Sequence, residues 1–76
     1  MYSIYRNDKL VGSSSDIEYV VEFTKLMIDK AIDTERDASR LKQLYEYKLV
    51  LNSPKVGINQ LQHILARLEY SLEVDI

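Results

Sequence analysis

The chain has no cysteine, so its 76 residues must fold around a small apolar core without disulfides or thiolate metal sites. A single core in a chain below about 70–80 residues rarely supplies more than about 3–5 kcal/mol of stability. Self-association adds to that stability, because an interface removes further apolar area from water. We therefore expect one small domain over residues 1–76 that binds either a second copy of itself or another protein.

The first segment, residues 2–12, is typical of a β-hairpin. Its Tyr, Ile and Val residues favour strands. Asn7 and Asp8 lie between the two expected strands, and both residue types accept the left-handed backbone of a tight turn. Gly12 marks the end of the second strand. A hairpin alone is marginal in water, so a helix face or a further strand must cover it.

An amphipathic helix is predicted over about residues 16–32. Ser15 and Glu18 have the spacing of a capping box, in which each side chain bonds the backbone of the other. One face is apolar at helical spacing and comprises Ile17, Val20, Val21, Thr24, Met27, Ile28 and Ala31. Phe23 and Leu26 widen this apolar sector, which predicts burial of the helix on two sides.

A second helix is predicted over about residues 35–50. Asp33 and Thr34 are the expected break, because Thr34 can cap a helix whose first turn is acidic. The alternative is one bent helix from residue 16 to about residue 50. We favour the break, since a helix of about 35 residues is long for so small a domain.

Residues 45–51 fit either a helix or a strand. Apolar and polar residues alternate there as they do in a strand, yet the helical pattern also continues through them. We favour the helix, because nothing between Ser39 and Tyr47 interrupts it.

A third helix is predicted over about residues 58–71, after Pro54, which stops any helix that runs through it. Asn59 is the expected N-cap. An apolar seam then follows at Ile58, Leu61, Leu65, Leu68 and Leu72. Residues 70–76 alternate between apolar and polar, which allows a short C-terminal strand paired with the hairpin. The fold class is thus α+β and mainly α, with an N-terminal β-hairpin packed on two or three amphipathic helices.

No motif for catalysis or metal binding stands out. His63 is the only histidine, and its helical neighbours three and four residues away include no carboxylate. Metal sites need clusters of His, Cys, Asp or Glu, and the serines at 13–15 lack the pattern of a catalytic nucleophile. We expect no enzyme activity, no cofactor, no metal and no small-molecule substrate.

The location expected from the sequence is cytoplasmic. No stretch approaches the roughly 18 apolar residues of a membrane span, and the N-terminus lacks the pattern of a secretion signal. A chain without cysteine is also compatible with a reducing compartment. We therefore expect no membrane partner.

Binding to another protein is the main candidate function. The region around residues 45–51 carries more apolar surface than one short helix can hide, and tyrosine is a residue that suits interfaces. We expect the contacts to come from Tyr45, Tyr47, Leu49 and Leu51. The protein would then be a small non-enzymatic interaction module, acting as an adaptor, regulator or inhibitor, and would self-associate.

The alternative function is DNA binding in the manner of a helix-turn-helix regulator. Residues 35–55 hold five basic and three acidic side chains, a net +2 in a chain of net charge −2. Their order of helix, Pro- and Gly-containing turn and helix has the outline of that motif. The contact residues would be Arg36 and Arg40 for phosphates, with Gln60 and His63 for bases.

Overall fold

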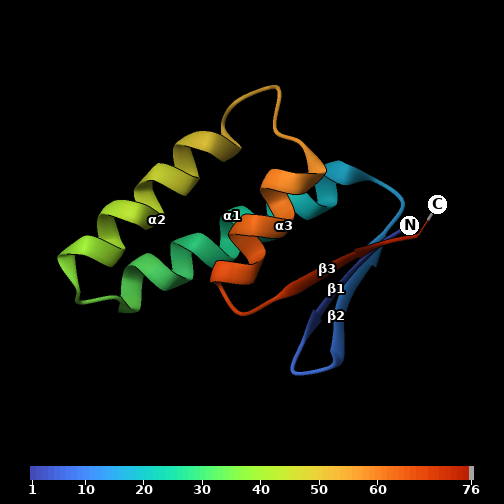
Figure 1. The fold of residues 1–76 in the computed structure, drawn as a ribbon, viewed down its shortest axis with the longest axis horizontal. Helices are drawn as coiled ribbons and strands as arrows, with labels where there is room; N and C mark the ends of the chain where they lie inside the picture. The colour runs from blue at the N-terminus through green and yellow to red at the C-terminus, as the bar shows by residue number, and fades with distance from the viewer. Residues whose placement is uncertain (76) are drawn as a thin grey trace.

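The computed structural model describes residues 1–75 and contains a hairpin, three helices and a short last strand (Figure 1). In chain order these are β1 (Tyr2–Arg6), β2 (Lys9–Ser14), α1 (Ile17–Thr34), α2 (Ala38–Leu51), α3 (Ile58–Arg67) and β3 (Ser71–Val74). The predicted α+β, mainly α class is confirmed. Ile76, the last residue of the segment expected to form a strand, lies outside the described residues.

The three strands form one antiparallel sheet in the order β2-β1-β3, so the first strand of the chain is also the central one. Ile4 of β1 pairs with Gly12 of β2 on one side and with Leu72 of β3 on the other. Ile4 and Leu72 are buried, and the helices lie on one side of the sheet (Figure 1). The predicted pairing of the C-terminal segment with the hairpin is therefore confirmed.

The hairpin turns at Asn7 and Asp8, as predicted, with positive φ angles of 52° and 64°. Two residues with positive φ match the type I′ turn of two-residue hairpin loops. β2 extends to Ser14, two residues beyond the expected end. It also carries a β-bulge, because the register shifts between Ile4 and Tyr5.

Two of the expected helix caps are wrong by one and three residues. Asp16, rather than Ser15, caps α1 and accepts a hydrogen bond from the Glu18 amide at 3.0 Å. Asp37, rather than Thr34, caps α2 and accepts from the Ser39 amide at 3.0 Å. In both cases an aspartate stands immediately before the first helical residue with extended backbone, which is the geometry that an N-cap needs.

The chain breaks between α1 and α2, as predicted, although the break falls at residues 35–37. Thr34 is the last residue of α1, and its hydroxyl donates to the carbonyls of Lys30 and Ala31 in the same helix. Residues 45–51 are helical, which confirms the favoured alternative. Leu26 is exposed, so the predicted burial of α1 on two sides is wrong at that position.

α3 begins after Gly57, not at Asn59, and ends at Arg67, four residues before the predicted end. Gln60 Oε1 accepts from the Gly57 amide at 2.8 Å. At the other end the Tyr70 amide donates to the Leu65 carbonyl at 2.8 Å and the Glu69 amide to the Ala66 carbonyl at 3.1 Å. This pair of bonds is a Schellman motif, with Glu69 at φ 70° in the position that glycine usually holds.

The core forms where the helices meet the sheet. Its buried apolar residues are Ile4, Val20, Val21, Ile28, Leu44, Leu51, Leu61, Ile64, Leu65 and Leu72. The hairpin also packs on α1, because a side chain at Gly12 would collide with the hydroxyl of Tyr19. All three helices and two strands thus contribute to one small core, as the seam and face patterns predicted.

Replacement of Glu69 by glycine is expected to raise the free energy of unfolding by about 0.5–1 kcal/mol. Left-handed backbone costs an L-residue about 1–2 kcal/mol, and the greater freedom of glycine in the unfolded chain offsets part of the gain. Urea denaturation measures the change. Glu69→Ala is the control, because it removes the same carboxylate and keeps Cβ. Equal stabilisation by both variants would contradict the backbone explanation.

Candidate functional site

The four residues expected to contact a partner divide into two pairs. Tyr45 and Leu49 lie one turn apart on α2 and are 53% and 72% exposed. Leu51 is only 2% exposed and belongs to the core, while Tyr47 is half-buried and packs against it. A partner can therefore reach Tyr45 and Leu49, whereas Leu51 offers it no surface.

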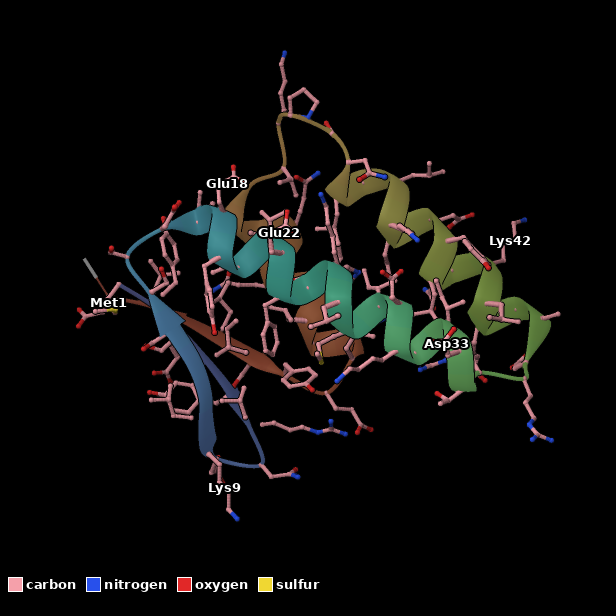
Figure 2. The ribbon with its side chains drawn as sticks, turned by 180° about the vertical axis from the view of Figure 1, so that it is seen from behind. Met1, Lys9, Glu18, Glu22, Asp33 and Lys42 are labelled. Atoms are coloured by element: carbon pink, nitrogen blue, oxygen red, sulfur yellow. The ribbon has the colours of Figure 1, made fainter. Side chains whose placement is uncertain are left out.

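α1 adds a third exposed apolar side chain to this region, since Leu26 is 53% exposed. It lies between Asp29 and Asp33 on one side and Glu22 on the other, at spacings that keep all four residues on one stripe of the helix. Figure 2, seen from behind, shows α1 and α2 next to each other, with α3 beyond them. We call this surface the outer helical face and define it by Leu26, Asp29 and Asp33 of α1 with Lys42, Tyr45 and Leu49 of α2.

An ion pair ties the two helices together at this face. Lys48 Nζ lies 2.9 Å from Asp29 Oδ1. The hydrogen bond and the negative charge of Asp29 raise the pKa of Lys48 above its ordinary value of 10.5, and Tyr45 adds a smaller effect in the same direction. The exposed pair joins α2 to α1 on the side where Tyr45 and Leu49 lie.

Asp29→Asn is expected to lower the pKa of Lys48 towards 10.5. A lysine whose pKa is raised in the folded state stabilises that state fully below pH 10.5 and loses this effect as the pH rises through the raised value. Measurement of the Lys48 Cε chemical shift against pH by ¹³C NMR tests this. Asp33→Asn serves as the control and should leave the pKa unchanged. An unchanged pKa in Asp29→Asn would refute the pairing.

A shallow groove lies between α2 and α3. Its cavity of about 280 Å³ is lined by Tyr47, Val50, Asn59, Gln60, His63 and Ile64. The rings of Tyr47 and His63 meet edge to face, with centroids 6.2 Å apart. The volume is just below the range of about 300–1,000 Å³ for small-molecule sites. The Tyr47 hydroxyl is buried and has no hydrogen-bond partner among the described residues.

Tyr47→Phe is expected to stabilise the fold by up to about 1 kcal/mol. A buried polar group without a partner costs about 1–3 kcal/mol, and phenylalanine keeps the ring that packs beside His63. Tyr45→Phe is the matched control on the same helix, and its exposed hydroxyl should matter by less than about 0.5 kcal/mol. A clear loss of stability in Tyr47→Phe, measured by thermal unfolding, would show that the hydroxyl does have a partner.

The four residues of the DNA-binding alternative lie in two separate places. Arg36 lies in the connection before α2, and Arg40 Nε lies 3.5 Å from Glu35 Oε2. Gln60 and His63 line the groove beside the last turns of α2. The turn between α2 and α3 covers residues 52–57 and is longer than the usual three or four residues. Nucleic-acid binding stays a prediction without a supporting observation.

A polar cluster that the sequence analysis missed joins the sheet to the helices. An Arg6 guanidinium nitrogen donates to the Tyr70 hydroxyl at 3.1 Å, and the guanidinium carbon lies 5.1 Å from the centre of the Tyr70 ring. The same hydroxyl donates to Met27 Sδ at 3.1 Å. The spacing of these residues along the chain gives no signal, because the partners are 64 and 43 residues apart in the sequence. We interpret the cluster as a structural clamp.

Residues 1–75 contain no group of three or more potential metal ligands. Within the same described part of the chain, no helix combines the length and apolar character needed to cross a bilayer. Comparisons with protein-family models, with curated proteins and with solved structures found no match.

Proposed function

We propose that this protein is a small non-enzymatic interaction module that binds protein through its outer helical face. The supporting observation is the exposure of Tyr45 and Leu49 on a helix whose other face builds the core. Full burial of a large apolar side chain contributes about 1.5–3 kcal/mol, so these two residues and Leu26 supply a useful part of a binding free energy. Exposed apolar side chains that gather in one place mark interaction sites.

The role of adaptor, regulator or inhibitor suits such a surface. A protein of this kind acts by occupying a partner, and it requires one complementary face rather than a pocket with placed acids and bases. The charged residues of the face, Asp33 and Lys42 among them, would form the polar rim of the interface. We place this activity in the cytoplasm, because a chain without cysteine suits a reducing compartment.

Affinity capture with three baits tests the proposal: the wild-type chain, Leu49→Glu and Leu10→Glu. Leu10 is a matched control, because it is 57% exposed but lies on β2. A partner bound through the outer helical face should be retained by the wild type and by Leu10→Glu. Its affinity for Leu49→Glu should fall about 30-fold or more, since a buried charge replaces an apolar anchor.

Circular dichroism of each bait must first show an unchanged fold. Retention of every captured protein by Leu49→Glu would contradict the proposal. Loss with Leu10→Glu alone would place the contact on the hairpin instead.

A further inference from the structure

We propose that the outer helical face binds a second copy of this chain, with α1 of each protomer packed antiparallel against α2 of its partner. This inference rests on the proposed function and names the partner. The two copies would be related by a twofold axis, and α1 and α2 of both copies would together form a four-helix bundle. Each contact would then occur twice, as in other twofold interfaces.

The first argument is that the two helices have matching spacings. Leu26 and Asp33 are seven residues apart on α1, and Lys42 and Leu49 are seven residues apart on α2. Seven residues are close to two helical turns, so each pair lies on one stripe. An antiparallel pairing that places Leu26 against the partner's Leu49 therefore also places Asp33 against the partner's Lys42.

The second argument is charge complementarity between the two helices. α1 carries four acidic and two basic side chains, for a net charge of −2, whereas α2 carries three basic and one acidic, for a net +2. Packing α1 on the partner's α2 brings opposite charges together. Packing α1 on the partner's α1 would bring like charges together, which costs several kcal/mol at an interface. The charges thus select the α1-to-α2 arrangement.

The charges proposed to meet a second copy are among those that form no ion pair inside the described part of the chain. Asp29 is already held by Lys48, and Arg40 by Glu35. Asp33 and Lys42 form no ion pair within residues 1–75. Figure 2 shows Asp33 on α1 and Lys42 on α2. A partner copy would supply each of them with an opposite charge.

Pairing of two copies through the sheet is less favourable, because both sheet edges carry features that hinder pairing. Met1 and Asp75 exchange backbone hydrogen bonds. Because bonded and non-bonded pairs alternate along an antiparallel ladder, the Leu72 carbonyl points away from β1, to the outer edge of β3. Gln62 Nε2 of α3 donates to that carbonyl at 3.2 Å. The bulge disrupts β2 at the other edge, and bulges and exposed lysines such as Lys9 are means by which edges resist pairing.

A charge-exchange experiment tests this arrangement. The 8.9 kDa chain is followed by sedimentation equilibrium at low salt over a concentration series up to about 1 mM. The wild type should approach twice the monomer mass. Asp33→Lys alone places lysine against the partner's Lys42, and Lys42→Asp alone places aspartate against the partner's Asp33. Each single variant should therefore dimerise about tenfold more weakly.

Mixing the two single variants provides the decisive measurement. In a dimer of one Asp33→Lys chain with one Lys42→Asp chain, both contacts again hold opposite charges, and the signs are exchanged at one of them. Association should therefore return to within about threefold of the wild type. Leu49→Glu should abolish dimerisation and the control Leu10→Glu should not. Failure of the mixture to associate better than either variant, or a dimer that survives Leu49→Glu, would overturn the inference.

The outcomes separate this inference from the proposed function. A wild-type chain that stays monomeric throughout overturns the second-copy inference. If it nevertheless captures another protein in a manner that depends on Leu49, the proposed function stands. If it stays monomeric and captures nothing, both fail.

Discussion

The pairing of β3 with β1 is the contact on which the rest of the structure depends. A two-stranded hairpin is marginal in water, and β3 turns it into a three-stranded sheet with Ile4 at its centre. The same pairing brings residues 1 and 75 together, and Met1 and Asp75 exchange backbone hydrogen bonds there. The three helices lie between β1 and β3 in the sequence, so this pairing joins the segments before and after them. It also brings Arg6 close to Tyr70, where the hydrogen bond between them forms.

Much of this fold could be predicted from the sequence, because each element carries its own local signal. The turn at Asn7 and Asp8, the helical periodicities and the alternating last segment all led to the correct element. The caps were harder to predict, since acceptors such as Ser15 and Asp16 lie side by side. Which of them caps the helix depends on where the backbone becomes extended, and that is set by the path of the chain between elements.

The candidate site was predictable in part, for a related reason. Periodicity assigns residues to faces of a helix, but it does not say which face the neighbouring elements will cover. Leu49 and Leu51 have the same side chain and lie two residues apart, yet one is exposed and the other belongs to the core. Leu26 was misassigned in the same way. Its neighbours on the stripe, Glu22 and Asp29, are charged, and this was the available signal that the stripe faces water.

The opposite charges of α1 and α2 connect the fold to the proposed interface. Within one chain they favour the antiparallel packing of α2 on α1, through Asp29 and Lys48. Opposite charges are also present on the outer helical face, where Asp33 and Lys42 form no ion pair with another described residue. Because the outer helical face carries both Asp33 and Lys42, it can set each of them against the opposite charge of a second copy. Leu26, Tyr45 and Leu49 lie outside the core, and in the proposed dimer a second copy would place Leu26 against Leu49 and so remove both from water.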